Sequence, residues 1–96
     1  VLYENGRPVR REGYLTELFG LAAVDWLSER KQKPWFLYVP FNAPHSPFQT
    51  PDHREIPPGS WNKGDRKTYA GMVEAMDKQV GAILAQLRHI GAVENT

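Results

Sequence analysis

The residue of this sequence that is best placed to do chemistry is His45, which lies in the run Pro44-His45-Ser46-Pro47. An imidazole gains and loses a proton near neutral pH, so a positioned histidine can act as a general acid or base. The two prolines restrict the backbone of Ala43 and Ser46 and thereby stiffen the loop that carries the ring. A lone loop histidine is also often a structural hydrogen-bonding residue, and the residue pattern leaves both interpretations open.

The other two histidines give weaker signals. His53 lies in the polar turn Asp52-His53-Arg54, where we expect it to be solvated. His89 lies near the carboxyl end of a predicted helix, where a cation interacts favourably with the helix dipole. The three histidines lack the spacing of metal ligands, and the sequence contains no cysteine for a thiolate site, a nucleophile or a disulfide. We therefore predict no metal site built from this segment alone.

A few further side chains have two interpretations each. Trp61 and Lys63 come late in a long loop and could contact a substrate, although Trp61 could equally anchor the loop. Asp77 lies beside the apolar stripe of a predicted helix, where we expect a half-buried carboxylate with a structural partner. Met72 and Met76 belong to that stripe, which indicates core packing and not a cofactor site.

Composition excludes several classes of partner. The 96 residues carry 12 Lys and Arg against 11 Asp and Glu, and a net charge of +1 argues against electrostatic capture of nucleic acid. No apolar stretch approaches the roughly 18 residues that a membrane span needs, and no signal peptide is visible. The sequence starts at Val1, already in strand-like sequence, and ends shortly after a predicted helix. We therefore expect it to be an internal segment of a longer protein.

Hydrophobic periodicity predicts the elements before His45. Asn5-Gly6 favours a type I′ turn, which predicts a hairpin over residues 1–9. A helix is predicted over residues 16–30, and Trp35 to Val39 is a nearly continuous apolar run that predicts a buried parallel strand. A helix followed by such a strand indicates an α/β fold, and His45 would then lie on the loop that leaves the strand, where α/β proteins place their chemistry. The apolar stripe of the predicted helix is Leu15, Leu18, Phe19, Ala22 and Trp26.

The elements after His45 are a long loop and a long helix. Residues 41–64 contain five prolines and exceed ordinary connector length, so we expect a functional loop. Asp65 can cap a helix over residues 66–90, and Gly91 supplies its left-handed stop. The apolar stripe of this helix is Tyr69, Met72, Val73, Met76, Val80, Ile83, Leu84 and Leu87.

Four stretches of the sequence, in order along the chain, together resemble the type I sulfatases, and most of all their arylsulfatase B-like and bacterial arylsulfatase members. They are Gly13-Tyr14-Leu15-Thr16-Glu17, residues 34–47 (PWFLYVPFNAPHSP), residues 69–77 (YAGMVEAMD), and residues 80–91. The likeness extends in order from Leu2-Tyr3 to Asn95-Thr96.

The resemblance implies more than the residue pattern does. It implies an internal segment of an alkaline-phosphatase-like fold, with a central, mostly parallel sheet flanked by helices. It implies a sulfuric ester hydrolase that acts on sulfate-ester small molecules or sulfated glycans at a calcium ion. The nucleophile of the family is a formylglycine made from Cys or Ser in a Cys/Ser-x-Pro-x-Arg motif. The family's histidine in Pro-His-x-Pro faces the sulfate and assists departure of the alcohol, and this role transfers to His45.

The family's other active-site motifs are missing from these 96 residues. The Cys/Ser-x-Pro-x-Arg motif, the paired aspartates and Asp-Asn pair that bind calcium, and the catalytic lysines do not occur, so the segment alone should be inactive. Two alternatives stay open: a phosphonate monoester or phosphodiester hydrolase of the same superfamily, and a degenerate, non-catalytic homologue that acts as a binding or structural module. The resemblance suggests a periplasmic, secreted or lysosomal location, which the residues themselves leave undetermined.

Overall fold

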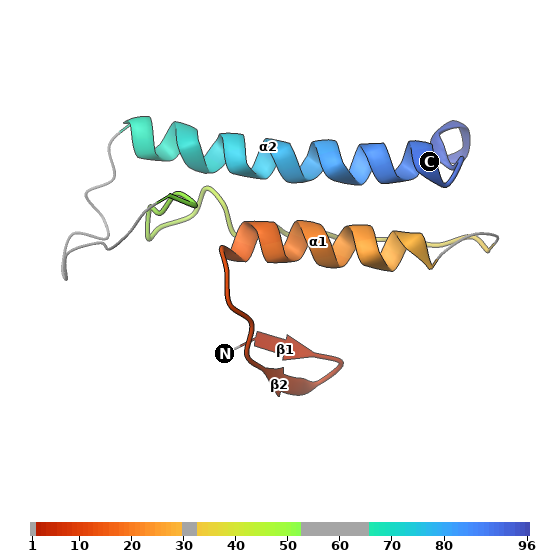
Figure 1. The fold of residues 1–96 in the computed structure, drawn as a ribbon, viewed down its shortest axis with the longest axis horizontal. Coiled ribbons are helices and arrows are strands. Elements are labelled where there is room, and N and C mark those ends of the chain that lie inside the picture. The colour runs from red at the N-terminus through yellow and green to blue at the C-terminus, as the bar shows by residue number, and fades with distance from the viewer. Residues whose placement is uncertain (1, 30–32, 53–65) are drawn as a thin grey trace.

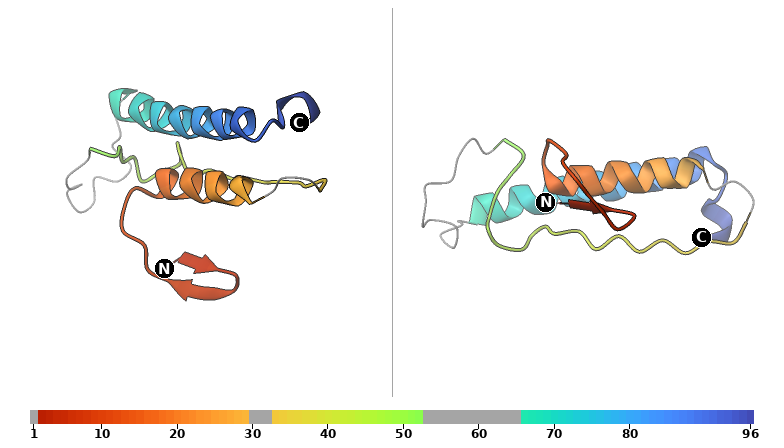
Figure 2. Two further views of the ribbon diagram at one scale, coloured as in Figure 1. Left: turned by 45° about the vertical axis from the view of Figure 1, so that its right-hand side comes forward. Right: turned by 90° about the horizontal axis from the view of Figure 1, so that it is seen from below.

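Two helices that lie side by side form the body of the chain (Figure 1). The computed structural model describes residues 2–29, 33–52 and 66–96. Helix α1 spans Leu15–Ser28 and helix α2 spans Arg66–His89, where the sequence predicts helices over 16–30 and 66–90. Both helices run in the same direction, because the extended segment between them returns along α1 (Figures 1 and 2). This is the order of elements that an α/β unit requires.

A small hairpin projects from the start of α1, on the side away from α2 (Figure 1). Strand β1 (Leu2–Glu4) pairs antiparallel with β2 (Arg7–Val9), in a register that sets Leu2 opposite Val9. Asn5 and Gly6 have φ values of 51° and 77°, the two positive values that a type I′ turn needs. The local signal of Asn-Gly is thus sufficient to form the hairpin.

Helix α1 is buried along a stripe of mostly small residues. This stripe is Thr16, Gly20, Ala23 and Leu27. A Cβ atom on Gly20 would come within 2.7 Å of the Cβ of Gln79, so α2 packs against α1 at a distance that excludes a side chain there. The predicted stripe from Leu15 to Trp26 is only partly covered, and it lies on an adjacent face of the helix. Small residues rather than large apolar ones therefore mark the most buried face.

Helix α2 buries Met72, Ala75 and Leu87 and ends in a Schellman motif. Gly91 has a φ of 70°, and the Ala92 N–H donates to the Leu87 carbonyl at 2.9 Å. The prediction of a half-buried Asp77 is wrong. Asp77 is exposed, because it lies well away from the face of α2 that Met72 and Leu87 define.

The predicted strand over residues 35–39 is extended, and it pairs with no other segment of the described residues. Exposure alternates along it: Trp35, Leu37 and Val39 are partly covered, whereas Phe36 is 86% and Tyr38 is 75% exposed. The ring of Trp35 packs edge-on against that of Trp26 in α1, with centroids 5.8 Å apart. Among the described residues the only sheet is the antiparallel pair β1–β2, so the predicted burial on both faces is not seen in this chain.

The loop that the sequence places at residues 41–64 is described as far as Asp52. The ring of Phe48 lies 6.3 Å from that of Tyr69, which attaches this loop to the first turn of α2. A Cβ atom on Gly71 would come within 2.7 Å of the Thr50 methyl group, a second point of close contact with α2. The predictions for His53, Trp61, Lys63 and Asp65 lie outside the described residues.

Candidate functional site

A pocket of about 560 Å³ lies where the loop that follows the extended segment meets the start of α1. Three parts of the chain line it: the first residues of α1, the loop, and one side chain of α2. The lining residues are Gly13, Tyr14, Leu15, Phe41, Asn42, His45, Ser46, Pro47, Gln49 and Met72. Within the described part of the chain the lining contains no carboxylate, lysine or arginine. His45 is therefore the lining residue whose side chain most often acts as a general acid or base in proteins.

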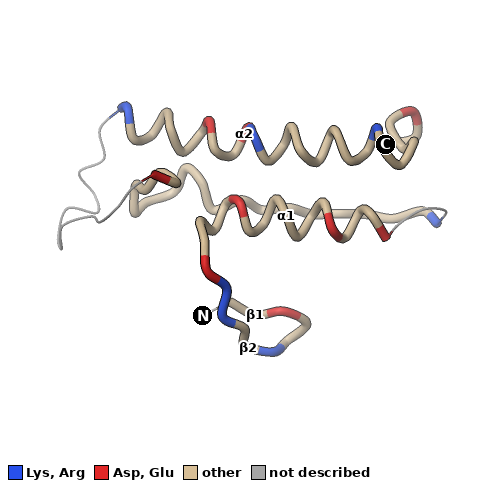
Figure 3. The backbone as a smooth tube through the Cα atoms, in the orientation of Figure 1, with Lys and Arg blue, Asp and Glu red and all other residues tan. Residues whose placement is uncertain are grey.

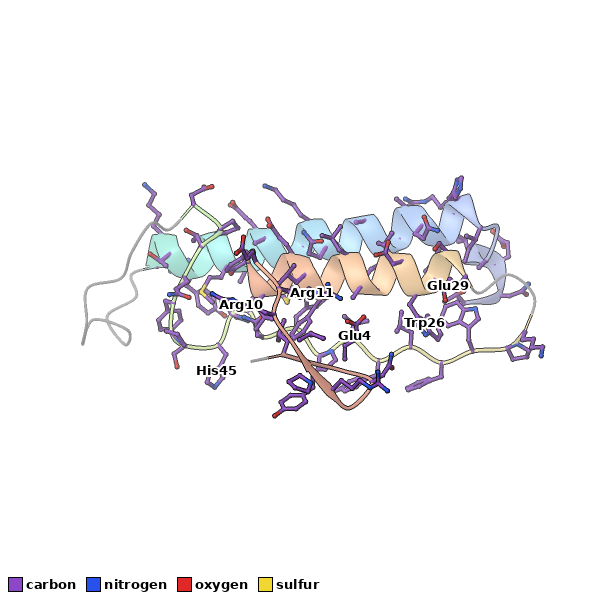
Figure 4. The ribbon with its side chains drawn as sticks, turned by 60° about the horizontal axis from the view of Figure 1, so that its bottom comes forward. Glu4, Arg10, Arg11, Trp26, Glu29 and His45 are labelled. Carbon is purple, nitrogen blue, oxygen red and sulfur yellow. The ribbon has the colours of Figure 1, made fainter. Side chains whose placement is uncertain are left out.

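The ring of His45 is exposed and projects away from the helices (Figure 4). Its Nδ1 atom lies 2.7 Å from the carbonyl oxygen of Ser46. A carbonyl oxygen can only accept a hydrogen bond, so Nδ1 must carry the proton of this contact. Nε2 is consequently the nitrogen that can meet a ligand. It accepts a proton when the ring is neutral and donates one when the ring is an imidazolium.

The backbone around His45 forms a compact turn. The His45 N–H donates to the carbonyl of Asn42 at 2.9 Å, and Ala43 between them is buried. The peptide bonds Ala43–Pro44 and Ser46–Pro47 are both cis. The two prolines that the sequence singles out thus lie on either side of the histidine in this turn.

Two side chains at the start of α1 hold this loop. The hydroxyl of Thr16 donates to Oδ1 of Asn42 at 3.0 Å, and the hydroxyl of Tyr14 donates to the carbonyl of Gln49 at 2.8 Å. Both bonds join residues that are far apart in sequence. Sequence reasoning did not single out Thr16 or Asn42, because nothing in the residue pattern shows that these two positions meet.

The described residues do not fit a metal centre. Across residues 2–29, 33–52 and 66–96, no group of three or more His, Asp or Glu side chains could hold a metal ion. Calcium requires six to eight oxygen ligands, and the pocket lining offers no carboxylate among them. His89, at the end of α2, is exposed and is not among the residues that line the pocket.

Charge and hydropathy add little to the site. The charged residues of α1 are acidic, Glu17 and Asp25, whereas α2 and the hairpin carry both signs, and no large region of one sign is seen in the described chain (Figure 3). On the hairpin side, Arg11 pairs with Glu4 at 2.6 Å across exposed surface, an interaction that contributes little to stability. None of the described helices has the length and apolar character that a membrane crossing requires.

A sequence profile of one family, described as Sulfatase, matches residues 2–96. The chain belongs to the sulfatase family. The resemblance that the sequence carries from Gly13 to Gly91 is thereby confirmed. The pocket around His45 therefore lies within a sulfatase segment, and its histidine lies in the run Pro44-His45-Ser46-Pro47.

Relatives and solved structures agree with this assignment. The sulfatase segment is 29% identical over 99 residues to the uncharacterized sulfatase YdeN of Escherichia coli K12, covering 99% of this chain. It is 32% identical over 94 residues to the N-acetylgalactosamine-6-sulfatase of Mus musculus, covering 93% of this chain. The crystal structure of Ps i-CgsB superposes with a TM-score of 0.79 at 36% identity over 96% of this chain. The same protein in complex with k-i-k-neocarrahexaose gives a TM-score of 0.78 at 35% identity.

The sulfatase segment is short compared with these proteins. It covers 18% of the length of YdeN, 17% of the mouse enzyme and 21% of either Ps i-CgsB chain.

Proposed function

We propose that this chain is part of the catalytic domain of a sulfatase that hydrolyses sulfate esters, and that His45 contacts the sulfate or protonates the leaving alcohol. The family assignment supports the reaction class. The observation that carries the role of His45 is its geometry: the residue lines the pocket, and Nδ1 is engaged by the Ser46 carbonyl, which leaves Nε2 free of that contact. The remainder of the domain would supply the other active-site groups.

The chemistry explains why such a histidine is useful. Cleavage of a sulfate ester with departure of an alcohol leaves charge on an alkoxide, which is a poor leaving group. A positioned general acid that protonates the departing oxygen contributes roughly 10²- to 10⁴-fold to the rate. In this geometry His45 donates from Nε2 while Nδ1–H stays on the Ser46 carbonyl. The contact to Ser46 keeps the ring in one orientation through proton transfer.

Calcium and formylglycine belong to the proposal only as contributions from elsewhere in the protein. The described residues do not fit a calcium site, and the sequence has neither a cysteine nor a Cys/Ser-x-Pro-x-Arg motif from which formylglycine could form. According to the resemblance, the metal would bind the sulfate and the modified residue would supply the nucleophile, both held by residues outside this segment. This segment would contribute the pocket wall that carries His45.

The same proposal accounts for the unpaired segment over residues 35–39. We infer that it is a strand of a central, mostly parallel sheet whose other strands lie elsewhere in an alkaline-phosphatase-like domain. The exposure of Phe36 and Tyr38, on the face opposite α1, supports this inference, because the second face of such a strand is normally covered.

A sulfated glycan is the substrate class that the comparisons favour. Ps i-CgsB, which superposes on 96% of this chain, has been solved in complex with k-i-k-neocarrahexaose. The pocket around His45 is open and not enclosed, and an open pocket can admit one unit of a longer chain of sugars.

The test uses the full-length protein that contains this chain. Release of inorganic sulfate would be measured by ion chromatography, with an aryl sulfate and a sulfated oligosaccharide as substrates. We expect His45→Ala to lower kcat by at least about tenfold, and the matched control His89→Ala to leave it unchanged. An unchanged kcat in His45→Ala would remove His45 from the mechanism. Preference for a phosphodiester or a phosphonate monoester, or no turnover of any ester, would support one of the two alternative functions.

A further inference from the structure

We propose that Thr16 and Asn42 are positioning residues for His45. The Thr16 hydroxyl fixes the Asn42 side chain, and the Asn42 backbone fixes the turn that carries His45. This inference rests on the proposed role of His45 and deepens it, because it identifies what holds the general acid in place. It assigns a positioning role to Thr16, which does not line the pocket, and to Asn42, which acts on His45 through its own hydrogen bonds.

The first step of the argument is the burial of Thr16. Its exposure is 0%, and it is the one polar residue in the buried set of the described chain. Its hydroxyl donates to Oδ1 of Asn42 at 3.0 Å, and the described residues leave no buried polar side-chain atom without a partner. A buried hydroxyl without a partner is costly, so this contact strongly favours one placement of Asn42.

The second step links Asn42 to the histidine. The carbonyl of the same Asn42 accepts the N–H of His45 at 2.9 Å, so a single residue joins α1 through its side chain and the histidine through its backbone. A movement of Asn42 away from α1 would carry the turn with it.

The third step concerns the ring itself. The His45 side chain is exposed, and its ring forms a hydrogen bond with the carbonyl of its own neighbour, Ser46. An exposed ring has little packing to hold it, so its position depends on the backbone below it. That backbone is held on one side by Thr16 through Asn42 and on the other by Tyr14 through Gln49. Of these two attachments, the one through Thr16 is the more buried and the closer in sequence to His45.

The experiment compares three variants of the full-length protein. Thr16→Val keeps the shape and removes the hydroxyl, and Thr16→Ser keeps the hydroxyl. Ser28→Ala is the matched control, because it removes a helix hydroxyl that bonds within α1, to the carbonyl of Asp25. Each variant is assayed with an alkyl or sugar sulfate, whose alcohol leaves poorly, and with a nitrophenyl sulfate, whose phenol leaves readily.

Displacement of a general acid lowers the reaction rate most for substrates with poor leaving groups. For the alkyl or sugar sulfate we expect Thr16→Val to lower kcat at least about fivefold with KM within about twofold, since small displacements of a catalytic group are costly. With the nitrophenyl sulfate the loss should be under about twofold, because protonation of that leaving group matters less. Thr16→Ser and Ser28→Ala should resemble the wild type with both substrates. Equal losses with both substrates would mean general destabilisation and would overturn the positioning role.

Hydrogen exchange provides a readout that does not depend on activity. The His45 amide, which donates to Asn42, should exchange at least about tenfold faster in Thr16→Val than in the wild type, and at the wild-type rate in the other two variants. Unchanged exchange in Thr16→Val would contradict the proposed link. If His45→Ala impairs the enzyme but Thr16→Val does not, the positioning inference fails and the proposed function stands. If His45→Ala is without effect, the proposed function fails first.

Discussion

At the scale of single residues, the loop around His45 is held by two hydrogen bonds of different character. The bond from Thr16 is made by a fully buried hydroxyl, whereas the bond from Tyr14 to the Gln49 carbonyl lies at exposed surface. Water can replace a lost hydrogen-bond partner at the surface but not in the interior, so two hydrogen bonds of similar length can contribute differently to stability. We therefore expect the buried hydrogen bond from Thr16 to hold the loop more strongly than the exposed one from Tyr14.

This ranking makes a prediction for Tyr14. Tyr14→Phe removes the hydroxyl that bonds the Gln49 carbonyl and leaves the ring in place. We expect less than about 1.5 kcal/mol of lost stability, since the freed carbonyl can bond to water. The loss of kcat with an alkyl sulfate should be smaller than in Thr16→Val. Chemical denaturation and steady-state kinetics of the full-length protein would measure both. A larger loss in Tyr14→Phe than in Thr16→Val would show that the ranking by burial is wrong.

At the scale of elements, the features that could be predicted from the sequence are those that depend on a few neighbouring residues, such as turns and helix ends. Asn5-Gly6 predicted the hairpin and Gly91 the helix stop, because each signal depends on the φ angles of one or two residues. The helices themselves follow from periodicity. The buried face of α1 is not predictable in the same way, because its apolar stripe lies beside the face on which mostly small residues are buried. Gly20 is buried because α2 comes close to it, and such a contact depends on the packed pair of helices.

Contacts between residues that are far apart in the sequence could not be predicted either, because they also depend on how the elements pack. Thr16 and Asn42 are 26 residues apart, and only the return of the extended segment along α1 brings them together. The apolar run and the prolines predict a loop at His45, and the structure places this loop after the extended segment. The ring nitrogen that is engaged by the Ser46 carbonyl could not be predicted, because that contact depends on the backbone turn at Ser46.

Two glycines on the helices offer a matched prediction for packing. A Cβ atom on Gly20 would collide with Gln79, whereas one on Gly81 would meet nothing within 4 Å. We expect Gly20→Ala to destabilise the full-length protein by about 1–3 kcal/mol through overpacking. Gly81→Ala should stabilise it by about 0.5–1 kcal/mol through its better helix propensity. Urea denaturation of the two variants would measure the difference. A stabilising Gly20→Ala would contradict the close packing of α1 and α2 at this point.

At the scale of the whole molecule, the chain exposes more surface than a compact protein of its size. Its accessible surface is 7949 Å², whereas a compact monomer of 11.0 kDa exposes about 5,600 Å². Its radius of gyration is 15.5 Å, against about 12.5 Å for a compact domain of this length. Phe36 and Tyr38 contribute large apolar side chains to this excess. A surface of this kind is what an element of a larger core presents when its neighbours are absent.

The last prediction follows from this excess of surface. Produced alone, the 96 residues should bind a hydrophobic dye such as ANS and should melt without a cooperative transition, because the face that carries Phe36 and Tyr38 has nothing to pack against. Replacing both residues by serine should lower dye binding by the isolated chain. In the full-length protein the same double replacement should lower the stability by at least about 3 kcal/mol, because there both rings would be buried. Differential scanning calorimetry and dye fluorescence on the four samples would distinguish the two situations. A sharp melt of the isolated chain, or a full-length protein indifferent to the double replacement, would show that this face is a true outer surface and not part of a sheet.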